Sequence, residues 1–171
     1  MKSVEHQLQK AERLAAITQQ IGFTLWQLQE LEGVSAQYFV LLAQAHKGMG
    51  LNSGNALVEK AQAKTFGSTV GQLIKAGLLS SELEARFTSL LRERNWLVHK
   101  SRVSSRSAVH NDDAMQQLLV RLDVIAEESL SLLKVIGALI EGFVKQHGVS
   151  AQDIDEGAQR ILEQWHAADA L

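Results

Sequence analysis

The sequence predicts an all-α protein, folded as an antiparallel helical bundle of four main helices with short accessory helices. Two observations lead to this fold class. The 171 residues include no proline and are rich in Ala, Leu, Gln, Glu and Lys, which are good helix formers. Apolar residues also recur at three- and four-residue spacing from Val4 to Trp165. The length suits a single domain that spans residues 1–171 and buries its own core.

Each predicted helix is bounded by residues that favour helix ends. Ser, Thr, Asn and Asp accept hydrogen bonds from the N–H groups of a first turn, and glycine adopts the left-handed conformation after a last turn. The expected helices span residues 4–32, 35–46, 56–64, about 68–77, about 81–103, about 114–146 and about 150–168. The predicted caps are Gly33, Ser35, Ser68 or Thr69, Gly77, Ser80 or Ser81, Asn111 or Asp112, and Gly148. Residues 104–111 are expected to form the most mobile loop.

Composition excludes several kinds of site. The chain has no cysteine, which excludes disulfides, thiolate zinc sites and a cysteine nucleophile. Its six histidines include no His-x3-His pair and only one Glu-x2-His spacing, at Glu163 and His166, whereas a helical-bundle metal site needs two such motifs, so we expect no metal site and no cofactor. The N-terminus is polar and the longest apolar stretch, residues 130–140, is too short to cross a bilayer. These features favour a cytoplasmic protein without a membrane partner.

A basic segment is concealed by the net charge of −2. Residues 92–106 contain five Arg or Lys residues and one Glu, which gives a local charge of +4. A basic segment in an otherwise acidic chain suits a localised anion site better than an extended nucleic-acid track. Arg92, Lys100 and Arg102 are therefore the expected phosphate- or RNA-binding residues. The alternative is a solvated helix end, where cations complement the helix dipole.

The most informative motif in this segment is Arg94-Asn95-Trp96-Leu97-Val98-His99. It places a permanent cation near an imidazole, a group that exchanges protons at neutral pH. Asn95 and His99 are i,i+4 neighbours on one helix face, whereas Arg94 lies about 140° from His99. The long Arg94 side chain, or a partner subunit, is needed to bring the two together. Trp96 either anchors the core or stacks on a nucleotide base.

This Arg-Asn-x3-His motif resembles the signature of the HEPN superfamily, small all-helical proteins that include metal-independent ribonucleases and toxin components. The resemblance implies that His99 performs acid–base work on a ribose 2′-hydroxyl and that Arg94 stabilises the scissile phosphate. It implies that Asn95 orients His99 or the phosphate, and that cleavage leaves a cyclic phosphate end. It also implies a homodimer, because the family pairs two motif helices across a two-fold axis.

Two functions are consistent with this resemblance. The first is a metal-independent endoribonuclease of a toxin–antitoxin or defence system, which acts on RNA and docks an antitoxin or another protein partner. The second is a non-catalytic helical regulator or adaptor, of transcription for example, that binds a protein or nucleotide partner. A weaker resemblance, to mannitol-repressor-like regulators with a Leu-Arg-x3-Asn-His helix end, supports the second function. The order of Arg94, Asn95 and His99 is closer to the catalytic pattern.

Overall fold

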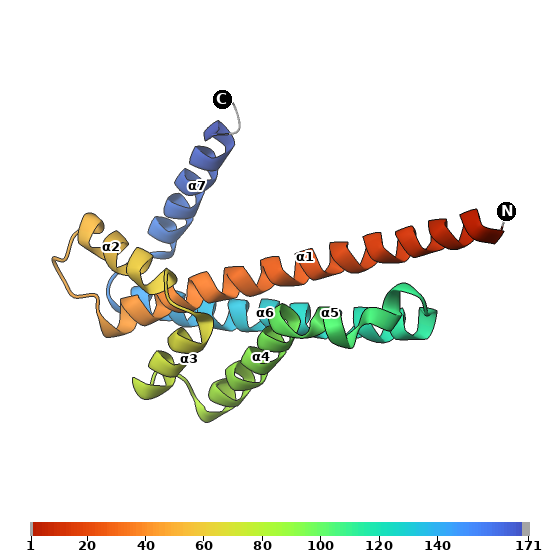
Figure 1. Ribbon diagram of the computed structural model, residues 1–171. Coiled ribbons are helices and arrows are strands. Elements are labelled where there is room, and N and C mark those ends of the chain that lie inside the picture. The colour runs from red at the N-terminus through yellow and green to blue at the C-terminus, as the bar shows by residue number, and fades with distance from the viewer. Residues whose placement is uncertain (1, 169–171) are drawn as a thin grey trace. The chain divides into compact units, whose positions relative to one another are not determined.

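The computed structural model describes residues 2–168, and within them it contains seven α-helices, one short 3-10 helix and no strand (Figure 1). The prediction of an all-α fold is confirmed. The helices are α1 (Lys2–Ala43), α2 (Leu51–Gln62), α3 (Phe66–Lys75), α4 (Ser81–His99), α5 (Ser101–Ser104), η1 (Arg106–Val109), α6 (Asp112–Gln146) and α7 (Ala151–Ala168). None of the helices described is long and apolar enough to cross a membrane.

The chain forms two compact units, one up to Ile136 and one from Gly137 onward. Helix α6 continues through this boundary. The first unit contains α1 to α5, η1 and most of α6, and it carries every residue of the Arg-Asn-x3-His motif. A single functional domain over residues 1–171 stays a prediction.

The core of the first unit is centred on α6. Buried residues of this helix recur every four and three positions, at Leu118, Leu122, Ile125, Ser129, Leu132 and Ile136. This spacing places them on one face of the helix. Fully buried residues of α1, α3 and α4 complete the core, and they include Leu28, Leu31, Phe66, Leu73 and Phe87.

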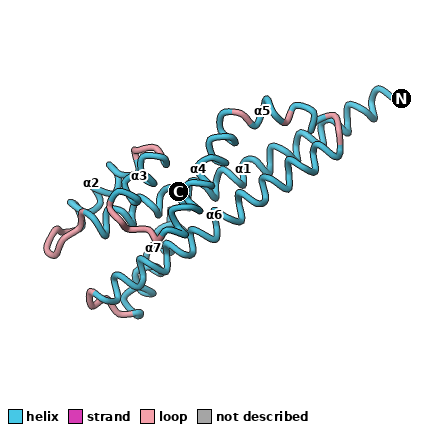
Figure 2. Tube along the Cα trace, turned by 90° about the horizontal axis from the view of Figure 1, so that it is seen from below, coloured by secondary structure: helices cyan, strands magenta, loops and turns pink. Residues whose placement is uncertain are grey.

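Helices α1 and α6 lie side by side and run in the same direction (Figure 2). Arg13 forms an ion pair with Asp112 at 2.6 Å, and about ten residues further along both helices the Thr24 hydroxyl donates a hydrogen bond to the Leu122 carbonyl at 3.3 Å. These two helices can run in parallel because α4, α5 and η1 lead the chain back to the end of the first unit where α1 begins, and α6 starts there (Figure 1). The predicted antiparallel bundle of four main helices is therefore not confirmed.

Helix α1 is longer than the sequence predicts. The expected break at Gly33 and Ser35 is wrong, because the helix continues through both residues to Ala43. Its buried face continues without a shift through Leu28, Leu31 and Ser35, all at most 1% exposed. A glycine inside a helix costs about 1 kcal/mol, and packing on both sides of Gly33 offsets this cost.

Two short helices start earlier than predicted. Helix α2 begins at Leu51 rather than near residue 56, and its inward face packs against Ala36 and Val40 of α1. Helix α3 is capped by Thr65, whose side chain accepts a hydrogen bond from the Ser68 N–H at 3.2 Å, so the predicted cap at Ser68 or Thr69 is wrong. The first turn is needed to bury Phe66, which is 1% exposed. Gly77 follows this helix with a φ of 66°, as expected for a glycine at a helix end.

The motif helix ends earlier than predicted. Ser80 caps α4 as expected, but the helix stops at His99 instead of continuing to residue 103. The side chains of Ser101 and Ser104 donate hydrogen bonds to the carbonyls of Leu97 and Lys100. The break itself lies at Lys100, whose backbone leaves helical geometry with a φ of −127°.

The segment expected to be a loop, residues 104–111, contains a short helical turn that the sequence did not predict. It contains η1, and Ala108 within it is fully buried. Asn111 then caps α6 as predicted, because its side-chain oxygen accepts a hydrogen bond from the Ala114 N–H at 2.9 Å. The mobility of this segment stays a prediction.

The second unit contains the end of α6 and helix α7. Gly148, with a φ of 89°, follows the end of α6 as predicted. The Ser150 N–H donates a hydrogen bond to the Asp153 carboxylate at 2.9 Å, and the Asp153 N–H donates one to the Ser150 hydroxyl oxygen at 3.1 Å. This reciprocal cap starts α7, and the hydrogen bonds from Ser150 lower the pKa of Asp153.

Candidate functional site

Helix α4 carries the motif, and its buried face fixes its position in the first unit. Phe87 is fully buried against Phe66 of α3, with ring centroids 6.1 Å apart. On another side of the helix, Arg86 makes a bidentate contact with Glu128 of α6, at 2.7 and 3.0 Å. These hydrogen bonds raise the pKa of Arg86. The N-terminal half of α4 is thus anchored to α3 and α6, and the buried residue Leu97 continues the inward face into its last turns.

Asn95 and His99 lie on the exposed face of α4. Arg92, one turn before them, is also exposed. The three residues share one face because their spacing is i,i+3 and i,i+4. This arrangement leaves an amide, an imidazole and a guanidinium accessible to a ligand.

Arg94 is turned away from this face and toward α1. Its Nε donates a hydrogen bond to the Glu32 carboxylate at 3.1 Å, and both side chains are only 25% exposed. The structure therefore brings Asn95 and His99 together but does not bring Arg94 to the same face within one chain. This outcome agrees with the angle of about 140° that helix geometry requires between Arg94 and His99.

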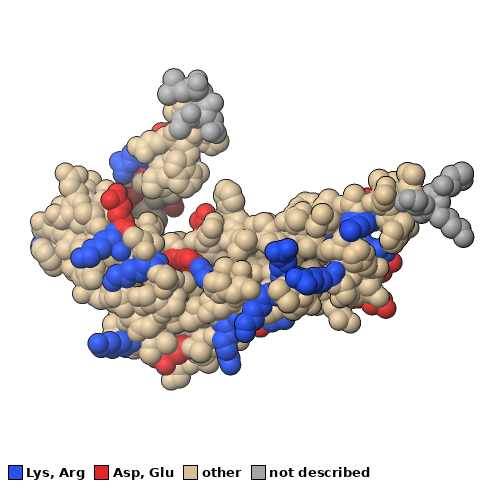
Figure 3. Space-filling model, in the orientation of Figure 1, with Lys and Arg blue, Asp and Glu red and all other residues tan. Residues whose placement is uncertain are grey.

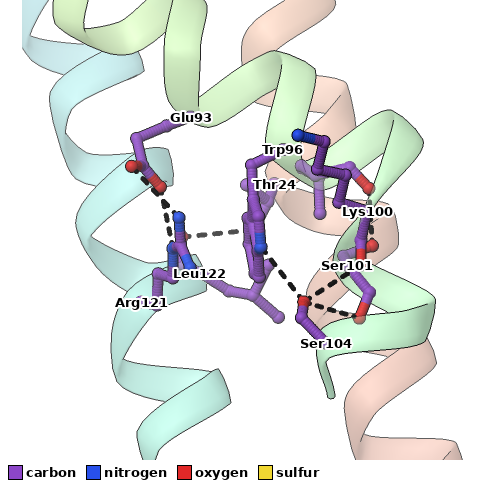
Figure 4. Close-up of polar contacts among 9 residues, drawn as sticks. Thr24, Glu93, Trp96, Lys100, Ser101, Ser104, Arg121 and Leu122 are labelled. Carbon is purple, nitrogen blue, oxygen red and sulfur yellow. Dashed lines mark hydrogen bonds and ion pairs between the residues drawn. The ribbon is translucent and has the colours of Figure 1, made fainter. Parts of the chain in front are cut away.

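Trp96 is held between three helices (Figure 4). The guanidinium carbon of Arg121, from α6, lies 3.4 Å from the centre of the Trp96 ring, and the indole N–H donates a hydrogen bond to Ser104 of α5 at 3.1 Å. Glu93 fixes Arg121 through contacts at 2.8 and 3.2 Å. These contacts favour the interpretation of Trp96 as an anchor, because base stacking on this ring face would have to displace Arg121.

Lys100 and Arg102 follow directly after the motif helix and are exposed. Arg106 of η1 is exposed as well. Basic side chains gather over the C-terminal end of α4 and over α5 on the face shown in Figure 3. The residues predicted to bind phosphate thus surround the end of the helix that presents His99.

Sequence reasoning missed the partners that hold the motif in place. Glu32 and Arg121 are separated from their partners by 62 and 28 residues along the chain. No local spacing signals such pairs, because a charged residue on a helix is usually solvated. Across the residues that the structure describes, no three His, Asp or Glu side chains gather closely enough to hold a metal ion.

Comparisons with protein-family models, with curated proteins and with solved structures find no match to this chain. The functional argument therefore depends on the residues of the site themselves.

Proposed function

We propose that this chain is a HEPN-like, cytoplasmic, homodimeric endoribonuclease that cleaves RNA without a metal ion, as part of a toxin–antitoxin or defence system. One observation supports it above the others. Asn95 and His99 stand together on the exposed face of a rigidly held helix, and Arg92, Lys100 and Arg102 supply exposed cations around that helix end. An imidazole among cations suits acid–base chemistry beside a phosphate.

In this mechanism, His99 removes the proton from a ribose 2′-hydroxyl, and the resulting oxygen attacks the adjacent phosphorus. The 5′-oxygen of the next nucleotide leaves with a proton donated by the His99 imidazolium, which returns to its neutral form, and a 2′,3′-cyclic phosphate remains. Asn95 orients His99, and Arg94 stabilises the charge on the phosphate oxygens. Glu32 holds the Arg94 guanidinium by its Nε, a contact that fixes its direction. Arg94 of one subunit and His99 of the other then share one cleft.

The direct test is incubation of the purified protein with mixed cellular RNA in excess chelator. Cleavage that yields cyclic phosphate ends is the expected result. Cleavage that appears only when a divalent metal is added would contradict the proposed chemistry, and intact RNA would contradict the proposed activity.

A first prediction concerns the oligomeric state. We expect a symmetric dimer, with twice the chain mass of 18.8 kDa, whose two-fold axis passes near the exposed face of α4. Val98, 47% exposed beside His99, supplies apolar surface for such a contact. We expect Val98→Asp to produce monomers in light scattering at micromolar concentration. Val120→Asp, a matched control on the exposed side of α6 at 50% exposure, should leave the dimer intact. A wild-type monomer would exclude the shared cleft.

A second prediction concerns RNA binding by the surrounding cations. We expect Arg92→Ala, Lys100→Ala and Arg102→Ala each to weaken RNA binding and to reduce the slope of log affinity against log salt by roughly one. Each variant removes one exposed cation and the counterion release that accompanies its phosphate contact. The measurement is fluorescence anisotropy over a salt series. Lys75→Ala, an exposed lysine at the end of α3, is the control that should retain the wild-type slope.

A second candidate function is a mannitol-repressor-like regulator or adaptor that binds a protein or nucleotide partner without turnover. The ion pair between Arg94 and Glu32 favours this function, because it gives Arg94 a structural role, the attachment of α4 to α1, that does not require catalysis. Under this function, Arg94→Ala and Glu32→Gln would lower stability to a similar extent and wild-type protein would leave RNA intact. The protein would then act by binding a partner protein, which could be an antitoxin or a protein that it regulates.

A further inference from the structure

We propose that a groove beside the candidate site binds a single-chain anionic amphiphile, an alkyl chain that carries a phosphate or carboxylate head group. The groove lies within the first unit, between α1 and the segment formed by α5 and η1, and has a volume of about 780 Å³. Small-molecule sites typically have volumes of about 300–1,000 Å³. The proposal does not depend on the proposed ribonuclease activity, although Arg102 lines the groove and is also one of the proposed RNA-binding residues.

The floor of the groove is aliphatic. Leu14, Ile17 and Ile21 lie along one stripe of α1, at spacings of three and four residues, and Val109 of η1 faces the same groove. From Lys10 to Ile21 the groove follows α1 for about 16 Å, at 1.5 Å per residue. No Phe, Tyr or Trp lines it, and His110 supplies its one imidazole ring. An extended alkyl chain matches this aliphatic stripe better than a nucleotide base, for which His110 offers the single stacking ring.

Four hydroxyl groups line the groove, and those of Thr18, Ser101 and Ser105 are already engaged by the backbone, whereas that of Ser107 is not. Thr18 donates a hydrogen bond to the Leu14 carbonyl at 2.9 Å. Ser101 likewise donates to the Leu97 carbonyl of α4, and Ser105 donates to the Ser101 carbonyl of α5. Because a hydroxyl has one proton to donate, these three groups offer no donor to a ligand. The walls are thus poorly suited to a sugar and favour an apolar occupant.

The rim of the groove is cationic. Lys10, Arg102 and Arg106 line it, and no Asp or Glu does. None of these three residues takes part in a salt bridge among the residues that the structure describes. Cations beside an apolar floor match an anionic head on an apolar chain, and a guanidinium fork binds phosphate or carboxylate with two parallel hydrogen bonds.

The test is isothermal titration of the full chain with dodecyl phosphate, dodecanoate, decyl phosphate and dodecanol, all below their micelle concentrations. We expect saturable binding of one dodecyl phosphate per chain, weaker for decyl phosphate by on the order of tenfold because two fewer methylenes are buried. Dodecanoate should bind and dodecanol should bind far more weakly. Absence of saturable binding, equal binding of dodecanol, or equal binding of a short nucleotide such as uridine monophosphate would overturn the proposal.

Two surface variants locate the ligand in the groove. Leu14→Gln removes a half-exposed part of the floor, and Arg106→Glu reverses one charge of the rim; each should weaken dodecyl phosphate binding at least about tenfold. The matched controls, Leu51→Gln in α2 and Lys75→Glu in α3, should bind as wild type. Equal affinity in all four variants would place the amphiphile elsewhere and overturn the assignment. Binding to phosphatidic acid vesicles without binding of monomeric dodecyl phosphate would also overturn it, in favour of a membrane surface.

Discussion

Replacing His99 or Arg94 by alanine should abolish RNA cleavage in chelator while the fold survives. Loss of an acid–base group or of a phosphate-stabilising contact costs about a hundredfold or more in rate. His99 is exposed, so its truncation should change the free energy of unfolding by less than about 0.5 kcal/mol. The measurement is the initial rate of cleavage of a labelled RNA, together with circular dichroism of each variant.

Two control variants separate catalysis from structure. His110→Ala removes another exposed histidine, after η1, and should retain wild-type cleavage. Glu32→Gln disrupts the ion pair with Arg94 but leaves Arg94 in place. If Arg94 acts on the phosphate, the Glu32→Gln variant should cleave RNA far faster than the Arg94→Ala variant. Equal losses in these two variants would assign Arg94 a structural role, and equal cleavage by His99→Ala and wild type would exclude His99 from the chemistry.

The helical class and most helix positions were predictable because they depend on local signals. Ser80 and Asn111 cap the helices expected of them, and Gly77 and Gly148 follow helix ends with positive φ angles. The break expected at Gly33 was wrong for a tertiary reason. A glycine lowers helix propensity only slightly, and the continuous buried face of α1 outweighs this local preference.

The site was predictable in part. Helix periodicity alone places Asn95 and His99 on one face, and the structure shows both exposed there. It was not possible to predict that Arg94 contacts Glu32 or that Trp96 stacks on Arg121, because these partners lie on helices far away in the sequence. Periodicity gives the direction of a side chain, but the neighbour that it meets depends on how helices pack.

The end of the motif helix shows a second limit of sequence reasoning. Apolar periodicity continues through Leu97, Val98 and Val103, so it predicts one helix to residue 103. The backbone instead leaves helical geometry at Lys100, and the helix stops at His99. Because of this break, His99 stands in a terminal turn beside Lys100. Cations placed there also complement the negative end of the helix dipole.

Phe87→Ala should be the most destabilising single substitution in the helix that carries the candidate site. Phe87 is fully buried and packs on Phe66, so its truncation leaves a cavity that the surrounding helices fill only in part. Such changes cost about 3–5 kcal/mol, a large share of the 5–15 kcal/mol that typically stabilises a domain. The measurement is urea unfolding followed by circular dichroism and tryptophan fluorescence.

The neighbouring exposed residue provides the matched control for this substitution. Thr88→Ala on the same turn of α4 should change the free energy of unfolding by less than about 0.5 kcal/mol. In Phe87→Ala, α4 loses its aromatic contact with Phe66 of α3, so Asn95 and His99 should lose their fixed position as the first unit loosens. RNA cleavage should therefore fall in Phe87→Ala in parallel with stability and recover at lower temperature, whereas His99→Ala should stay inactive while folded. A Phe87→Ala protein as stable as Thr88→Ala would mean that α4 is not held by this aromatic contact.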